Sequence, residues 1–558
     1  MSYPITRRRA LAGLATSLAL PLVAKGRGQG SPDSLSFMHG VASGDPDHES
    51  VVLWTRISGA EDTAAVDWEI ARDEGFERRA GAGRVITSAA RDFTVKVVAE
   101  GLLPGERYFF RFHSEGVLSP VGRARTLPRG ALETLGLAVV SCSNYPFGYF
   151  NAYDAIAADE DVDWVLHLGD YLYEYGVDGY GGDTGARLGR NHDPRHEIVS
   201  LADYRRRHAQ YKADPASQRM HGAHSLLAIW DDHESANNPW MDGAENHQAE
   251  REGSWDARRR ASLQAYFEWM PIRDPAKGLR REDYWRSWRF GDLAQIVSLE
   301  TRHTGRARQI EYAEHRDALN SAAEAKGFLR DVVGAPGRAM LSDAMERFLR
   351  GELGRAVHDG IPWRMLANQI PMARTHHPRL DNGTLEALRG TMTASAFSRL
   401  EEMARMGSLG LPLYLDPWDG YPWARERFYE LCRDCGVHDL LVLTGDSHSF
   451  WSNQLFTADG AAMGVELGTT GITSPGDFVE FGAEGARLID EQLAASNDEV
   501  LWTDGRHSGY LRLRVNREVV RGDYLSVSTI LEETYHVQTL KQIALTRAGG
   551  TLRYGEES

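Results

Sequence analysis

The stretch LAVVSCSNY, residues 137–145, is a short apolar run followed at once by residues that can bind a metal ion. Runs of this kind, bounded by polar residues, are typical of buried strands, and open α/β sheets bind ligands just beyond the carboxyl ends of their strands. Four more runs occur: residues 164–168 before Gly169-Asp170-Tyr171-Leu172-Tyr173, 226–230 before Asp231-Asp232-His233-Glu234, 294–299 before Glu300-Thr301-Arg302, and 440–443 before Gly445-Asp446-Ser447-His448. We therefore expect the clusters that follow these runs to converge on one site.

Two kinds of pattern flank and connect these runs. Short segments of alternating apolar and polar residues, at 51–55, 66–70, 93–97 and 108–112, predict a β-sandwich of immunoglobulin or fibronectin type at residues 31–128. From residue 129, strands alternate with charged helical stretches such as 256–269 and 343–351, which predicts a layered α/β domain that extends to residue 545. Residues 546–558 are expected to be a tail, either frayed or forming a final edge strand, and the glycine-rich residues 176–193 a loop near the site.

Length and charge narrow the class of protein. A chain of 558 residues exceeds the size at which one hydrophobic core stops growing, so at least two domains are expected. The formal net charge of -16 argues against a nucleic-acid partner, because phosphate backbones repel an acidic surface.

The N-terminus has the pattern of an export signal. Thr6-Arg7-Arg8-Arg9 is followed by the uncharged residues 10–24, and adjacent arginines indicate the twin-arginine route. We expect residues 1–30 to be recognised by the twin-arginine export machinery, and the protein to be periplasmic or secreted. A transmembrane anchor is disfavoured, because the stretch is shorter than the roughly 20 apolar residues that a spanning helix needs.

The chain has three cysteines, which is few for an exported protein stabilised by disulfides. Cys432-Arg433-Asp434-Cys435 has the spacing of a redox pair or a disulfide, but we favour two helix residues without a chemical role. Cys142 differs from both because it directly follows a predicted strand.

The residue types in the clusters indicate a site for two metal ions. A carboxylate that bridges two cations must project from a tight turn, and Gly169 allows the backbone to bend before Asp170. Tyr173 could bind a trivalent ion as phenolate, although a half-buried structural tyrosine is the alternative. Phenolate and thiolate together favour ferric iron over calcium or magnesium.

A site of this kind favours hydrolysis over redox chemistry. Two cations about 3.5 to 4 Å apart lower the pKa of water and stabilise the attacking and leaving oxygens of an in-line displacement, and phosphate esters benefit most. The sequence has no P-loop, dinucleotide-binding, His-Glu-x-x-His or Gly-x-Ser-x-Gly motif, which removes the commonest competing chemistries.

These motifs together resemble the PhoD-type alkaline phosphatases, secreted metallophosphoesterases with a site related to that of the purple acid phosphatases. The resemblance spans nearly all of the chain after the export signal. It also rests on segments outside the five clusters: Gly40-Val41-Ala42-Ser43-Gly44-Asp45-Pro46, Val52-Leu53-Trp54-Thr55-Arg56, Asp416-Pro417-Trp418-Asp419-Gly420-Tyr421 and Thr473-Ser474-Pro475-Gly476. The resemblance implies a fibronectin-like domain followed by a four-layered α/β metallophosphoesterase domain with two facing mixed sheets flanked by helices.

The resemblance also implies ferric iron paired with calcium. Matched position by position, the expected iron ligands are Cys142, Asp170, Tyr173 and His448. Asp170 would bridge to calcium, and the calcium ligands would be completed by Asp446 with Asp232 or its neighbour Asp231. Glu300 stands where the family more often has aspartate, and we do not expect it to be a ligand.

The resulting functional hypothesis is hydrolysis of phosphomonoesters and phosphodiesters by direct attack of a metal-bound hydroxide. We expect Asp170 and His233 to be catalytic, with His233 protonating the leaving group or orienting the phosphate, and Asn144 and Arg302 to bind the substrate. A purely structural Arg302 is the alternative for that residue. Two other functions stay open: a specialised phosphodiesterase acting on phospholipids or teichoic-acid-like polymers, and a secreted binding protein without activity.

Overall fold

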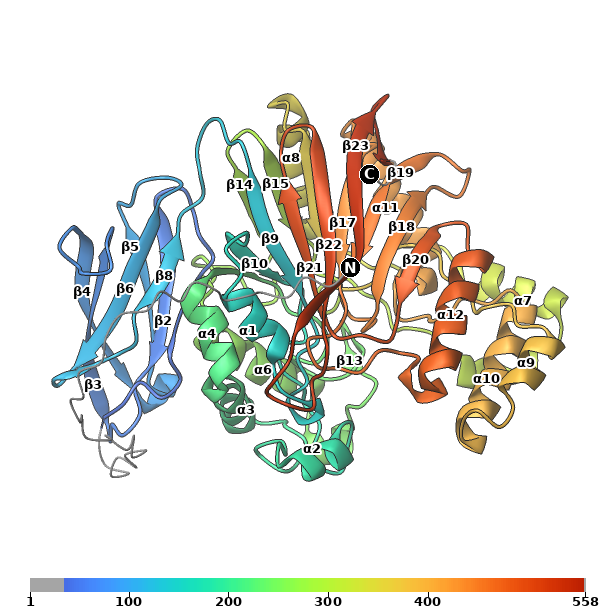
Figure 1. The fold of residues 1–558 in the computed structure, drawn as a ribbon, viewed down its shortest axis with the longest axis horizontal. Coiled ribbons are helices and arrows are strands. Elements are labelled where there is room, and N and C mark those ends of the chain that lie inside the picture. Colours follow the sequence, from blue (N-terminus) through green and yellow to red (C-terminus); the bar gives the residue numbers. More distant parts are fainter. Residues whose placement is uncertain (1–34, 556–558) are drawn as a thin grey trace, which may run out of the picture.

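The computed structural model describes residues 35–555, so the predicted export signal at residues 1–30 lies outside the described part of the chain. Two large sheets dominate it (Figure 1). The first has ten strands, in spatial order β24 (Thr551–Tyr554), β23 (Val537–Ala548), β22 (Val519–Val527), β21 (Gly509–Val515), β9 (Leu135–Val140), β10 (Trp164–His167), β11 (Ser225–Ala228), β1 (Val41–Gly44), β2 (Ser50–Arg56) and β5 (Thr94–Glu100). The second has seven, β14 (Ser287–Phe290), β15 (Ala294–Ser298), β16 (Trp363–Ala367), β17 (Leu440–Thr444), β19 (Ala462–Gly468), β18 (Phe450–Phe456) and β20 (Val500–Asp504).

Both sheets are mixed. In the first, β9, β10 and β11 run parallel, while β21 to β24 pair antiparallel. In the second, β15, β16, β17 and β19 are parallel and β14, β18 and β20 are antiparallel to their neighbours. The five runs predicted as buried strands correspond to β9, β10, β11, β15 and β17, every residue of which is buried.

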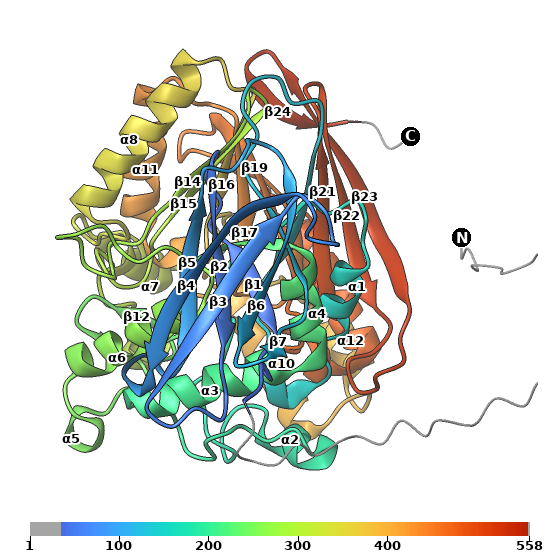
Figure 2. The same ribbon diagram turned by 90° about the vertical axis from the view of Figure 1, so that its left-hand side faces the viewer.

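The two sheets face each other across a shared apolar core, to which Leu166 of β10 and Leu443 of β17 belong. Helices cover the outer faces. A second core lies between the first sheet and the helices α1 (Asn151–Ala157), α3 (Leu201–Ala213), α4 (Pro215–Ala223) and α6 (Trp255–Trp269). A third lies between the second sheet and the helices α8 (Asp343–His358) and α11 (Pro422–Asp434). Figure 2 shows α8 and α11 outside the second sheet, whose strands β14 and β15 lie between these helices and strands β21 to β23 of the first sheet. The fold is therefore the predicted four-layered arrangement of two mixed sheets flanked by helices.

The helices begin where the sequence supplies caps. The side chain of Ser200 accepts a hydrogen bond from the Asp203 amide at the start of α3. The side chain of Ser254 accepts one from the Ala257 amide at the start of α6. The helices are α1 (Asn151–Ala157), α2 (Gly182–Leu188), α3 (Leu201–Ala213), α4 (Pro215–Ala223), α5 (Ala249–Glu252), α6 (Trp255–Trp269), α7 (Ala322–Phe328), α8 (Asp343–His358), α9 (Asn382–Leu388), α10 (Ala394–Ser408), α11 (Pro422–Asp434) and α12 (Gly482–Ser496). Helix α2 lies inside the stretch 176–193 that we expected to be a loop.

The N-terminal β-rich segment is a sandwich. A separate five-stranded sheet packs on β1, β2 and β5 of the ten-stranded sheet. Its strands are β4 (Arg79–Ser88), β3 (Thr63–Ala71), β6 (Arg107–Ser114) and β7 (Val117–Leu118), with β8 (Gly122–Arg125) also paired to β6. Its own apolar core includes Leu53, Val66 and Phe110. The smaller ladder of β12 (Pro239–Trp240) and β13 (Gly243–Ala244) belongs to the α/β part.

One sheet of this sandwich continues into the α/β part. Gly44 of β1 pairs in parallel with Leu226 of β11, and the Asp45 amide donates to the Leu226 carbonyl at 2.9 Å. Asp45 is buried, and its carboxylate accepts from Arg286 Nε at 2.8 Å and from the Arg273 amide at 2.9 Å. The boundary at residue 128 stays a prediction, but the hydrogen bonding of the sheet crosses it.

The close approach at Gly44 generates a stability prediction. A Cβ atom there would lie 2.6 Å from the Pro271 carbonyl oxygen and 2.7 Å from that of Leu226, so Gly44→Ala should lower the free energy of unfolding by about 1–3 kcal/mol. Chemical denaturation with urea measures the change. Gly222→Ala in α4, where a Cβ would meet nothing within 4 Å, is the matched control and should be neutral or slightly stabilising. Equal stability of the Gly44 and Gly222 variants would contradict the tight joint between β1 and β11.

Candidate metal centre

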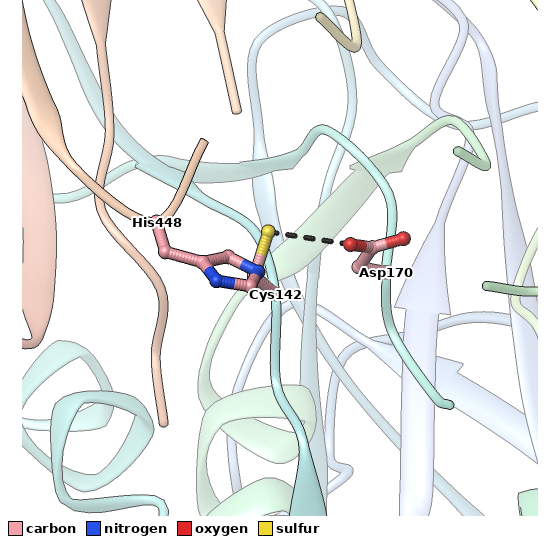
Figure 3. Close-up of side chains that lie close together, drawn as sticks. All are labelled: Cys142, Asp170 and His448. Carbon is pink, nitrogen blue, oxygen red and sulfur yellow. Dashed lines mark hydrogen bonds between the residues drawn. The ribbon is translucent and has the colours of Figure 1, made fainter. Parts of the chain in front are cut away.

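The turns that follow β9, β10, β11 and β17 bring their polar clusters together. Cys142, Asp170 and His448 each offer a ligand atom within 4.8 Å of the other two (Figure 3). A second group consists of Asp231, Asp232 and Asp446, and a third of Asp170, Asp232 and His233, within the same limit.

Four of these residues have left-handed backbone. Their φ angles are +60° at Cys142, +55° at Asp170, +66° at Asp446 and +51° at His448. Non-glycine residues in this region cost on the order of 1–3 kcal/mol each and persist where the surrounding structure holds them, commonly at functional sites. All four therefore sit on strained turns that direct their side chains to a common volume.

Gly169 lets two of these turns approach each other. Its φ is +110°, and a Cβ atom on it would lie 2.4 Å from the Asp231 amide nitrogen. A glycine is therefore required both for the backbone conformation before Asp170 and for the contact with the turn after β11.

Tyr173 joins the first group. Its hydroxyl lies 3.1 Å from Asp170 Oδ2 and 3.2 Å from His448 Nε2, and it accepts a 2.7 Å hydrogen bond from Ser474. The Cys142 thiol lies 3.4 Å from the same Asp170 oxygen. Asp170 Oδ2 thus contacts two further potential ligands of one ion, Cys142 and Tyr173, and His448 belongs to the same group.

The other oxygen of Asp170 faces the turn that follows β11. Asp170 Oδ1 accepts from the His233 amide at 3.3 Å, in the turn that carries Asp232. Asp170 is also the member shared by the first and third groups. The carboxylate therefore has the geometry of a bridge between two neighbouring ion sites.

The acidic residues of the first group have raised pKa values, so their protonated forms are favoured. Burial and the nearby Asp170 charge raise the pKa of the Cys142 thiol and of the Tyr173 phenol well above their usual values. Burial, together with Asp232, likewise raises the pKa of Asp170. A bound cation reverses this balance, since a coordinating thiol or phenol is deprotonated by the charge of the ion.

Two carboxylate oxygens of the second group lack hydrogen bonds, which also indicates a cation site. Asp231 Oδ2 and Asp232 Oδ1 are buried and have no hydrogen-bond partner among the described residues. Buried carboxylate oxygens are normally paired or coordinate a metal. The donor sets therefore fit two ions: thiolate, phenolate, imidazole and carboxylate on one side, and carboxylates on the other.

Two glutamates that the sequence analysis left without a role hold the turns in place. Glu234 accepts from the amides of Asp170 at 3.0 Å, Tyr171 at 2.6 Å and Asp231 at 2.8 Å, so one carboxylate ties the turn after β10 to the turn after β11. Glu174 lies 2.7 Å from His233 Nδ1 and accepts from the Asn237 amide at 2.6 Å. In the sequence, the only indication of these roles is that each glutamate directly follows a candidate site residue, Tyr173 or His233.

His233 lies against Tyr173 and Asp232. Its ring stacks on that of Tyr173 with centroids 4.1 Å apart, and its Nε2 lies 3.8 Å from Asp232 Oδ2. Burial alone would lower the pKa of His233, but the carboxylates of Asp232 and Glu174 outweigh it and raise the pKa well above 6.5. His233 can therefore act as a proton donor, and its place in the third group gives it the alternative of a ligand, which the sequence analysis did not consider.

Arg302 is fully buried among aspartates. It donates to Asp231, to Asp446 at 3.0 Å and to Asp416 at 2.8 Å, so its fork supports the carboxylates of the second group. Asp416, which carried no predicted role, holds Arg302 in this position.

Glu300 does not face the ion groups. It accepts from the amides of Arg302 at 3.0 Å, His303 at 2.7 Å and Thr304 at 2.8 Å, and thereby shapes the turn that carries Arg302. These hydrogen bonds give Glu300 a structural role in that turn.

Asn144 is buried two residues after Cys142, and both polar atoms of its side-chain amide lack a partner within residues 35–555. Thr473 donates to its backbone carbonyl at 2.8 Å, which holds the residue in place while the side chain stays available. An oriented, unpaired amide beside the first group is suited to a ligand or substrate oxygen.

Cys432 and Cys435 lie elsewhere. Cys432 is in α11 and Cys435 directly follows it, and both are free thiols. Neither belongs to a group of potential metal ligands in the described chain.

The fold and these groups of potential ligands are those expected of a metal-dependent hydrolase, and comparison with known proteins specifies the family. The model of the PhoD-like phosphatase family matches residues 137–524, and that of the PhoD-like phosphatase N-terminal domain matches residues 23–128. Alkaline phosphatase D of Bacillus subtilis (strain 168) is 32% identical over 525 residues, covering 91% of this chain and 80% of that protein. A solved structure of PhoD is 31% identical with a TM-score of 0.75, covering 94% of this chain and 92% of that one.

The chain therefore belongs to the PhoD-like phosphatases and is a phosphoric ester hydrolase of the alkaline phosphatase D type. The resemblance inferred from the motifs is confirmed.

The three hydrogen bonds of Glu234 generate a test of the site's architecture. Glu234→Gln removes the charge and one of the two acceptor oxygens, so the turns carrying Asp170 and Asp231 should separate and metal affinity should fall about 10–100-fold. Elemental analysis after dialysis against graded chelator measures the affinity. Glu61→Gln, at an exposed position of the N-terminal sandwich, is the control. Metal content equal to that of the control would exclude this role for Glu234.

Proposed function

We propose that this enzyme hydrolyses phosphomonoesters and phosphodiesters with a ferric ion and a calcium ion held by the two main ligand groups. The observation that carries the proposal is the position of Asp170, whose two carboxylate oxygens face different groups of buried ligands.

The ferric ion is assigned to Cys142, Asp170, Tyr173 and His448. Soft thiolate and anionic phenolate are ligands that suit iron rather than calcium or magnesium. His448 Nδ1 lies 3.1 Å from the Pro475 carbonyl, a contact that leaves Nε2 directed at Tyr173 and Asp170. Such a contact is typical of ligating histidines, whose second nitrogen is held by a carbonyl or carboxylate.

Calcium is assigned to Asp446 with Asp232 or Asp231, and Asp170 as the bridge. Arg302 Nε donates a hydrogen bond directly to Asp231, whereas Asp232 accepts a backbone hydrogen bond from Asn238 at 3.0 Å and its Oδ1 lies 3.7 Å from Arg302 Nη2, beyond hydrogen-bond distance. This difference favours Asp232 as the ligand and Asp231 as its support. A hard oxygen donor set suits calcium.

When bound, two cations would supply a hydroxide nucleophile near neutral pH and neutralise charge on the phosphoryl oxygens. The chain's own residues supply the rest. His233 holds a proton on Nε2 that it can give to the departing alkoxide, since Glu174 fixes the ring from Nδ1. Asn144 offers an amide donor to the substrate, whereas the guanidinium of Arg302 is occupied by aspartates and would bind phosphate only by exchanging one of them.

We also propose that the enzyme acts outside the cytoplasm after twin-arginine export, on the basis of the arginine-rich N-terminal segment. Across residues 35–555, none of the helices combines the length and apolar character that a membrane span requires.

The bridging role predicts a joint loss of metal and turnover. Asp170→Asn should remove at least half of the bound metal and lower kcat/KM by more than about 1,000-fold, because the amide oxygen cannot neutralise two cations. Hydrolysis of p-nitrophenyl phosphate and bis-p-nitrophenyl phosphate, with elemental analysis of the same samples, measures both. Asp62→Asn on an exposed turn is the control. A variant that keeps full metal and near-native activity contradicts the proposal.

The iron assignment predicts a coloured protein. A phenolate bound to ferric iron absorbs visible light, so Tyr173→Phe should weaken and shift the visible band of the purified enzyme. Tyr180→Phe is the matched control, because its ring packs 6.2 Å from that of Tyr173, whereas it is the Tyr173 hydroxyl that contacts Asp170 and His448. An identical spectrum for wild type and Tyr173→Phe would remove Tyr173 from the ligands.

A further inference from the structure

A short segment in the loop after β19 contacts three of the four expected iron ligands. The Ser474 amide donates to the Cys142 carbonyl at 3.2 Å. The Ser474 hydroxyl donates to the Tyr173 oxygen at 2.7 Å, and the Pro475 carbonyl lies 3.1 Å from His448 Nδ1. These three ligands come from the turns after β9, β10 and β17, so one segment is bound to all three turns.

Close packing fixes the backbone of this segment. A Cβ atom on Gly471 would lie 2.7 Å from the Ser474 carbonyl oxygen, and one on Gly476 would overlap the Gly505 carbonyl oxygen. The Thr473 hydroxyl donates at 2.8 Å to a backbone carbonyl in the loop after β9. The Ser474 side chain is therefore held in one position relative to the ligands.

The hydroxyl of Ser474 is dedicated to Tyr173. Ser474 is fully buried, and within residues 35–555 the one hydrogen bond of its hydroxyl is that to the Tyr173 oxygen. The Tyr173 hydroxyl itself lies 3.1 Å from Asp170 Oδ2, to which it donates. Once Tyr173 is a phenolate it has no proton to give and only accepts, and Ser474 is the donor placed to reach it.

A hydrogen bond to a ligand atom changes how much charge that atom gives to a metal. The donor draws electron density toward itself, so the ligand oxygen gives less to the ion. Groups that bond to the ligands in this way tune the reactivity and the reduction potential of bound metals.

We propose that Ser474 is a positioning residue that acts through Tyr173: its hydrogen bond limits the charge that the phenolate donates, so that the ferric ion keeps its strength as a Lewis acid. The inference rests on the proposed function, because it takes Tyr173 as a phenolate ligand of ferric iron. Ser474 has no contact with the substrate in this role.

Ser474→Ala removes the donor and leaves the phenolate oxygen richer in electrons. Transfer of an electron from phenolate to iron by visible light then needs less energy, so the visible band of the purified enzyme should move to longer wavelength. The reduction potential of the iron should fall, as followed by redox titration at the same band. With iron content unchanged, kcat for p-nitrophenyl phosphate should fall about tenfold, because the weaker Lewis acid stabilises the transition state less.

Ser452→Ala is the matched control. Ser452 is buried in β18, and its hydroxyl donates to the Tyr554 hydroxyl at 3.0 Å, so this variant deletes a serine–tyrosine hydrogen bond of the same kind in another part of the fold. The Tyr554 hydroxyl in turn donates to the Asn453 carbonyl at 3.1 Å. The visible band, the reduction potential and kcat should all stay at their wild-type values.

Three results would overturn the proposal, and they are distinguishable. A coloured wild type with an unshifted band in Ser474→Ala would exclude the tuning role of Ser474 and leave the iron assignment intact. Loss of iron from Ser474→Ala would show that the hydroxyl serves to retain the ion rather than to tune it. A colourless wild type would instead contradict the ligation of ferric iron by Tyr173, and with it the iron part of the proposed function.

Discussion

The structure depends on burying several carboxylates in one small volume. Asp170, Asp231, Asp232, Glu174 and Glu234 are all inaccessible to solvent or nearly so, and Asp446 is half-buried beside them. Burial of an unpaired carboxylate is costly, and such groups normally take up a proton, pair with a cation or bind a metal. Arg302 and His233 compensate part of this charge, and the remaining negative potential is suited to multivalent cations.

The facing sheets are the means by which the chain meets this requirement. Parallel strands end at the same edge, so residues separated by hundreds of positions, such as Cys142 and His448, reach one point. The turns are strained at both residues and at Asp170, where buried Glu234 accepts hydrogen bonds from the amides of Asp170 and Tyr171 and so holds the strained turn. Support of this kind holds the ligands in position before any ion arrives, which lowers the cost of ordering them on binding.

Much of this arrangement could be predicted from the sequence because it follows from local pattern. Apolar runs followed by metal-binding residues indicated the five central strands and brought Cys142, Asp170 and His448 to one site. Glu174 and Asp416 were not assigned roles, since a carboxylate that supports a neighbour has the same local pattern as one that binds a metal. Strand β4 was also missed, because its exposed sequence RAGAGRVITS lacks the apolar alternation of a half-buried strand. The junction of β1 with β11 depends on a pairing between residues 182 positions apart, for which no local signal exists.

That junction also bears on how the protein avoids self-association. Without β1, the short, wholly buried β11 would be the rim of the larger sheet, and a rim strand with free amides and carbonyls is a template for pairing with another chain. The sandwich moves the rim outward to β5, where the exposed Glu100 places a charge on the outermost strand. The N-terminal unit thus acts as a cap against edge-to-edge aggregation of the larger sheet.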